Sequence, residues 1–76
     1  MRYQDFITSD HNVLLGKPII KGTRLTVELI LRKLGEGATY SDLADMYPGL
    51  STEAILAVLQ YAADLVANEK DLRVAR

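Results

Sequence analysis

The sequence has 76 residues, of which 49% are hydrophobic, and its net charge is −1. A chain this short predicts one domain, which buries only about 60–65% of the surface that its unfolded form exposes. The absence of cysteine excludes disulfides, thiolate catalysis and Cys-ligated metal sites. No apolar run approaches the ~18 residues of a membrane span, and the first residues lack a signal-peptide core. We therefore expect a soluble cytoplasmic protein with no membrane partner.

Charge is distributed unevenly along the chain. Residues 1–33 hold six basic and three acidic side chains, whereas residues 34–69 hold six acidic side chains and no Lys or Arg. Such polarity suggests separate partners or self-complementary docking between copies. The alternative is that these charges only keep the surface solvated, and that their uneven distribution has no function.

An irregular β-hairpin is predicted for residues 1–25. Phe6–Thr8 is β-prone, a cluster of turn residues follows it, and the second arm falls within Val13–Ile20. Gly16 and Gly22 mark backbone bends, because glycine takes φ > 0 without steric cost. A lone two-stranded hairpin is marginal in water, so this one must pack on helices or pair with another chain.

Two short helices are predicted after the hairpin. Thr26 is a candidate N-cap for the first, over Val27–Gly35, where apolar residues recur at i, i+3, i+4 and i+7. Thr39 and Asp42 have the spacing of a capping box and start the second, which ends before the next proline.

The third and longest helix is predicted over Thr52–Asn68, with Ser51 as its N-cap and a Pro-Gly turn before it. Two short helices, a tight turn and a long helix are typical of a helix-turn-helix arrangement. The predicted fold class is therefore α+β, mainly α. It comprises a single domain with a hairpin arm over 1–25, a helix-turn-helix bundle over 26–68 and a flexible tail over 69–76.

The third helix is apolar over most of its circumference. We assign its core face to Ile55, Val58, Leu59, Ala62 and Val66. Its outward positions are Glu53, Ala57, Gln60 and Asp64. A second apolar stripe consists of Ala54, Tyr61 and Leu65. This stripe exceeds what two short helices and a hairpin can cover, so we predict that it forms a homodimer interface. The alternative is that the hairpin folds over it.

Catalytic chemistry is not expected from these residues. His11 is the only histidine and lies among turn residues, so no spacing of metal ligands is present. Asp42 and Asp45 lie one helical turn apart, but helix capping and a solvated face explain them without a general acid partner. We predict no catalytic residue, no metal and no cofactor.

Two parts of the chain are candidates for DNA binding. The basic residues Lys17, Lys21 and Arg24 suit phosphate, although lysines that keep an edge strand soluble are an equal explanation. Gln60 on the third helix has a side chain that reads adenine, but the acidic residues on either side of it would repel phosphate. The basic residues are therefore the better candidates.

Several motifs carry a resemblance to a known family. They are the string Gly16-Lys17-Pro18-Ile19-Ile20-Lys21-Gly22-Thr23-Arg24-Leu25-Thr26-Val27, the turn Tyr47-Pro48-Gly49-Leu50, and the pieces Ala54-Ile55 and Tyr61-Ala62-Ala63. With them, the chain from about Ile7 to Ala63 resembles the bacterial and archaeal family called domain of unknown function 433. The resemblance implies a short hairpin followed by a homeodomain-like helix-turn-helix. It also implies a role as the antitoxin-like partner of a PIN-like nuclease toxin.

From this resemblance we expect an antitoxin-like module of a toxin–antitoxin pair, which binds a PIN-like toxin and has operator DNA as a second candidate partner. The alternative is a stand-alone helix-turn-helix transcriptional regulator. Arg24 bears on this choice because its guanidinium offers a rigid fork to carboxylate or phosphate. As a structural residue it would pair with an acid of its own chain or of a dimer mate, and as a functional one it would meet DNA or an acidic nuclease site. We favour the structural role.

Overall fold

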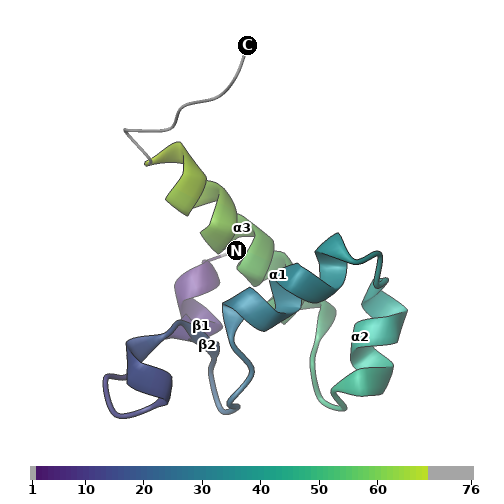
Figure 1. The fold of residues 1–76 in the computed structure, drawn as a ribbon, viewed down its shortest axis with the longest axis horizontal. Helices are drawn as coiled ribbons and strands as arrows, with labels where there is room; N and C mark the ends of the chain where they lie inside the picture. Colours follow the sequence, from purple (N-terminus) through teal and green to yellow (C-terminus); the bar gives the residue numbers. More distant parts are fainter. Residues whose placement is uncertain (1, 69–76) are drawn as a thin grey trace.

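The structure of the protein is a computed structural model, and the residues that it describes are 2–68 (Figure 1). Its elements, in chain order, are the short 3-10 helix η1 (Tyr3–Asp5), strand β1 (Ile7–Thr8), the 3-10 turn η2 (Leu14–Gly16), strand β2 (Ile19–Ile20), and helices α1 (Val27–Gly35), α2 (Tyr40–Met46) and α3 (Thr52–Ala67). The predicted class, α+β and mainly α with an N-terminal hairpin, is confirmed. The tail predicted over 69–76 lies outside the described residues.

The two strands form the predicted antiparallel hairpin. Ile7 pairs with Ile20 and Thr8 with Ile19, so the arms fall where the sequence placed them. An isolated bridge between Ile19 and Thr26 then brings the chain back alongside β2 before α1 begins. This return fixes the start of α1 against the hairpin.

The bends predicted at the two glycines are present. Gly16 has φ +82° and Gly22 has φ +79°, a region that side chains other than glycine rarely adopt. After Gly22, the Thr23 hydroxyl donates to the Ile20 carbonyl at 2.8 Å and accepts from the Leu25 amide at 3.0 Å. These two bonds close a tight turn that directs the chain into α1.

All three predicted N-caps are formed. The Thr26 hydroxyl accepts from the Leu29 amide at 3.0 Å, and the Ser51 hydroxyl accepts from the Ala54 amide at 3.1 Å. At α2, the Thr39 hydroxyl accepts from the Asp42 amide while the Asp42 carboxylate accepts from the Thr39 amide, which completes the capping box. Local sequence therefore sets each helix start.

One hydrophobic core joins the hairpin to the helices. Its buried members are Ile7, Ile20, Val27, Ile30, Leu43, Leu50, Ala54, Ile55, Ala57 and Val58. Strand residues and residues from all three helices belong to the same cluster, so the hairpin gains its stability by packing on the helices.

The buried face of α3 differs from the predicted one. Ile55 and Val58 are buried as expected, but Leu59 and Val66 are exposed, whereas Ala54 and Ala57 are only 3% and 0% exposed. The placement of Ala54 in a dimer interface is therefore wrong, as is the outward position given to Ala57. The reason is that η1 and β1 pack on α3 beside α1, and together they select which apolar stripe is covered.

Candidate interaction surface

The C-terminal half of α3, residues 59–67, is an apolar helix end with little cover. Figure 1 shows it extending beyond α1 and α2. Its polar side chains are Gln60 and Asp64 alone, yet Leu65 is 55% and Val66 61% exposed. A helix that is apolar nearly all round is normally buried, and an exposed patch of this kind marks an interaction surface. We call residues 59–67 the exposed end of α3.

The N-terminal arm meets the exposed end of α3 through Tyr3, which contacts Tyr61 and Asp64. The rings of Tyr3 and Tyr61 meet edge to face, with centroids 5.6 Å apart and planes at 80°. A hydrogen bond to the Asp64 carboxylate, aided by burial, raises the pKa of the Tyr3 hydroxyl. The alternative that the hairpin arm folds over the second stripe therefore holds for Ala54 and in part for Tyr61, while Leu65 is 55% exposed.

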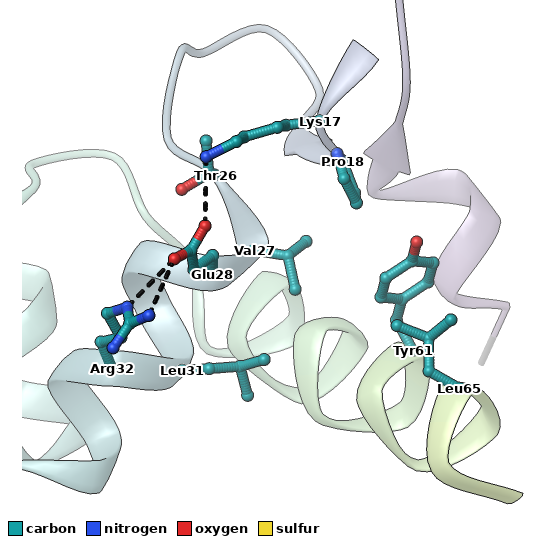
Figure 2. A pocket seen from close by; sticks show the side chains of 9 residues that line it. All are labelled: Lys17, Pro18, Thr26, Val27, Glu28, Leu31, Arg32, Tyr61 and Leu65. Carbon is teal, nitrogen blue, oxygen red and sulfur yellow. Dashed lines mark hydrogen bonds and ion pairs between the residues drawn. The ribbon is translucent and has the colours of Figure 1, made fainter. Parts of the chain in front are cut away.

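An apolar groove of about 390 Å³ lies between α1, the start of β2 and the exposed end of α3. Figure 2 shows Val27 and Leu31 of α1 facing Tyr61 and Leu65 of α3, with Pro18 beside them. These five side chains form an apolar floor. Two of the three predicted interface residues therefore line one groove.

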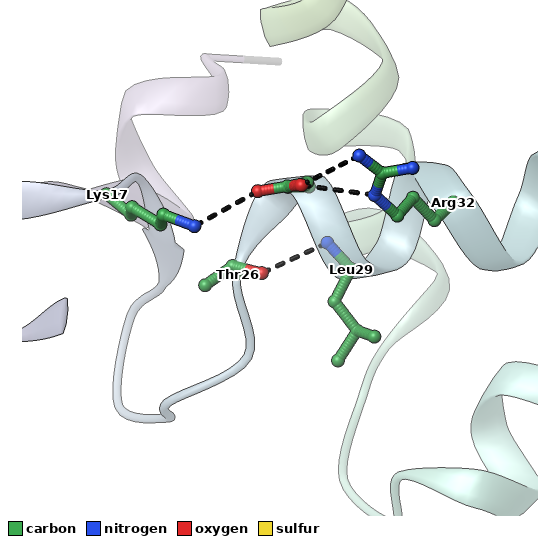
Figure 3. Close-up of polar contacts among 5 residues, drawn as sticks. Lys17, Thr26, Leu29 and Arg32 are labelled. Carbon is green, nitrogen blue, oxygen red and sulfur yellow. Dashed lines mark hydrogen bonds and ion pairs between the residues drawn. The ribbon is translucent and has the colours of Figure 1, made fainter.

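The rim of this groove is a charged cluster centred on Glu28 (Figure 3). Its carboxylate forms ion pairs with Arg32, whose Nη2 lies 3.0 Å away, and with Lys17, whose Nζ lies 3.3 Å away. The hydrogen bonds from Arg32 and then Lys17 hold the pKa of Glu28 below its ordinary value. All three side chains are more than half exposed, so the pairs add little to stability and leave a net positive rim. Lys17, predicted to contact DNA, is thus held in an ion pair.

The other two basic candidates, Lys21 and Arg24, lie at the turn between β2 and α1. Both are exposed, and neither forms an ion pair within residues 2–68. Lys21 and Thr23 line a pocket together with Gly49 and Ser51, which belong to the turn before α3. The structural pairing favoured for Arg24 is therefore not made with an acid of the described chain.

Gln60 is exposed on α3, with Glu53 and Asp64 also exposed on the same helix. The structure thus leaves Gln60 among acids, as its sequence neighbours indicated. Asp42 is engaged in the capping box. Among residues 2–68 no three His, Cys, Asp or Glu side chains are grouped to hold a metal ion. None of the described helices is both long and apolar enough to cross a membrane.

Sequence reasoning missed the loop before β2. Leu14, Leu15 and Gly16 are all left-handed, with φ of 51°, 58° and 82°, and Leu15 is 91% exposed. The Ser9 hydroxyl donates to the Gly16 carbonyl, and the Gly16 amide donates to the Val13 carbonyl at 3.0 Å, which ties the turn together. In the sequence only Gly16 indicated a bend here. The two leucines gave no indication of a left-handed turn, because leucine rarely adopts positive φ.

Comparison with known proteins places this architecture in a family. The family model described as Protein of unknown function (DUF433) matches residues 7–62. A crystal structure of a DUF433 member protein from Anabaena variabilis is similar, with a TM-score of 0.78 and 28% identity over 84% of this chain and 63% of that one. This chain thus spans less than two thirds of that protein's length. None of the curated proteins matches it. The resemblance in the glycine-bounded string and the later motifs is confirmed: the chain belongs to the DUF433 family.

Proposed function

We propose that this protein is a non-enzymatic, homodimeric interaction module that acts as the antitoxin-like partner of a PIN-like nuclease toxin. The observation that carries the proposal is the exposed end of α3, where Leu65 and Val66 are more than half exposed beside an apolar groove. A domain of 76 residues has little apolar surface to spare, so this amount of it outside the core supports a protein-binding role.

A second feature supports a nuclease as the partner. Lys21 and Arg24 project from one turn without an acidic partner in the described chain. The nuclease implied by the family resemblance has an acidic site, and a guanidinium binds carboxylates through two parallel hydrogen bonds. Arg24 is therefore our candidate for the residue that meets the acidic site of the toxin.

The test is co-expression with the product of the adjacent reading frame, followed by co-purification and a nuclease assay. We expect a stable complex in which the nuclease is inhibited. Arg24→Ala should weaken binding at least tenfold with an unchanged melting temperature, whereas Arg32→Ala, an exposed arginine already paired with Glu28, should bind normally. Two folded proteins that neither associate nor affect each other's activity would reject the proposal.

The second candidate function is a stand-alone helix-turn-helix regulator. The observation in its favour is that Lys21 lies beside the turn that precedes α3, the helix that would enter the major groove. On this hypothesis the protein alone should retard its own upstream DNA, with an affinity that falls steeply with salt. We expect Gln60→Ala to leave any such binding nearly intact, and a large loss of sequence-specific binding in that variant would favour the regulator.

A further inference from the structure

The outer side of α3 carries an apolar row that belongs neither to the core nor to the groove. Leu56, Leu59, Ala63 and Val66 follow one another at spacings of three, four and three residues. This is the a/d spacing of a heptad, so the four side chains share one face of the helix. All four are exposed, with Leu56 at 36%, Leu59 at 38% and Val66 at 61%. We call these four residues the outer stripe of α3.

The outer stripe lies on a different side of α3 from the groove and the core. Leu65, which lines the groove and which we assign to the contact between copies, follows Ala63 by two residues. The buried Ala54 and Ala57 each precede a leucine of the outer stripe by two residues. Because residues two apart on a helix do not face the same way, the outer stripe points elsewhere. No element within residues 2–68 buries it.

One edge of the outer stripe is acidic. Glu53, Gln60 and Asp64 recur at i, i+7 and i+11, which places them in one row beside the outer stripe, and all three are exposed. Neither carboxylate forms an ion pair within residues 2–68, although the Tyr3 hydroxyl hydrogen-bonds to Asp64. Residues 52–68 contain no Lys or Arg, so no basic residue of the helix balances this acidic edge.

We propose that the outer stripe binds an amphipathic helix of the partner protein, one with an apolar heptad row of its own and Lys or Arg along its edge. Apolar side chains at heptad spacing pack against a second helix, because each of them enters a gap between four side chains of that helix. The outer stripe covers ten helical steps, about 15 Å, so a partner helix of a few turns is sufficient. The inference rests on the antitoxin role proposed above and assigns the surface that its partner contacts.

Charge complementarity favours this occupant over a second copy. The ammonium or guanidinium groups of a basic helix would lie beside Glu53 and Asp64, where opposite charges attract and set the register. Helix α3 of a second copy has no basic residue to offer and would bring its own acidic edge instead. The occupant is therefore a basic helix from another protein.

Two designed peptides test this chemistry directly. Each consists of two heptads with Leu at a and d, and they differ only at the e and g positions, which are Lys in one peptide and Glu in the other. Fluorescence anisotropy of the labelled peptides with the whole protein gives the dissociation constants. We expect the Lys peptide to bind roughly tenfold more tightly at low salt, and the preference to shrink at high salt because ions screen exposed charges. Equal binding of both peptides, or binding of neither, would overturn the proposal.

A matched pair of variants locates the bound peptide on α3. Ala63→Asp places a carboxylate in the middle of the outer stripe, where a bound helix would bury it, and should weaken the Lys peptide roughly tenfold or more. Gln60→Asp adds the same charge at the acidic edge and should bind the Lys peptide at least as tightly as the wild type. Both positions are exposed, so circular dichroism should show both variants folded. Unchanged binding in Ala63→Asp, or equal loss in both variants, would overturn the proposal.

The same variants separate this inference from the proposed function. With the product of the adjacent reading frame in place of the peptide, we expect Ala63→Asp to lose the complex and Gln60→Asp to keep it. A complex that forms equally well with Ala63→Asp would overturn the outer stripe as the partner site while leaving the antitoxin role standing. If the wild type binds the Lys peptide through the outer stripe but not that product, the antitoxin role fails and the helix-binding site stands.

Light scattering distinguishes the partner helix from a second copy. Both variants should remain dimeric, because Leu65 is intact in each. A shift of Ala63→Asp alone to monomer would show that a second copy covers the outer stripe, and would overturn the proposal.

Discussion

The two halves of α3 have similar compositions and different surroundings. In the first half, Thr52–Val58, four residues are buried in the core, whereas in the second half, residues 59–67, none is buried and most are exposed. The difference comes from the neighbours: α1, η1 and β1 pack against α3, and η1 meets its second half through Tyr3, which contacts Tyr61 and Asp64. Apolar composition therefore does not decide whether a residue of α3 is buried. Burial depends on which neighbouring elements pack over that part of the helix.

The largest expected effect is loss of a core side chain in the first half. Ile55 is 1% exposed, and we expect Ile55→Ala to lower the free energy of unfolding by about 2–5 kcal/mol. A domain this small has little stability in reserve, so the variant should be largely unfolded at 37 °C. Denaturant titration followed by circular dichroism measures the change. Leu65→Ala is the matched control at low protein concentration, and an equal loss there would abolish the distinction between the two halves.

A smaller effect is expected from overfilling the core at Ala57. Because Ala57 is fully buried, Ala57→Leu should destabilise the fold by about 1–3 kcal/mol. The same change at Ala63, an exposed alanine of the second half, should alter the melting temperature little. Thermal melts of the two variants measure the contrast. If Ala57→Leu left the melting temperature unchanged, the outward position that the sequence pattern predicted for this residue would be correct.

The smallest effect is expected at the groove rim. The pKa of Glu28 is lowered in the folded protein, so its ion pairs contribute fully above the ordinary pKa of about 4.5 and lose their contribution as the pH falls through the lower folded value. Because the groups are exposed, Glu28→Gln should lower the melting temperature by a few degrees at most at neutral pH. Melts between acid and neutral pH, at low and high salt, measure it. A deficit that grows on acidification would contradict this assignment.

Local features of the fold were predictable from sequence. The caps Thr26, Thr39 and Ser51 and the bend at Gly22 depend on a few adjacent residues, and all of them form as expected. The hairpin arms were likewise placed correctly, because turn residues bound them.

The faces of α3 were not predictable in the same way. Periodicity identifies an apolar stripe only where a polar stripe opposes it, and α3 is apolar nearly all round, so Ala54 and Leu65 looked equivalent. Which one is buried depends on long-range packing of the arm. The left-handed pair Leu14–Leu15 was missed because nothing in a leucine signals positive φ. The groove needs residues from three separate segments, which no spacing reveals.

The central claim is that the exposed end of α3 is an interface between copies. Light scattering coupled to size exclusion, on the wild type and Leu65→Glu at micromolar concentration, tests it most directly. We predict a dimer for the wild type and a monomer for Leu65→Glu that keeps its helical circular dichroism, since Leu65 lies outside the core. A well-folded wild-type monomer at the same concentration would contradict the claim.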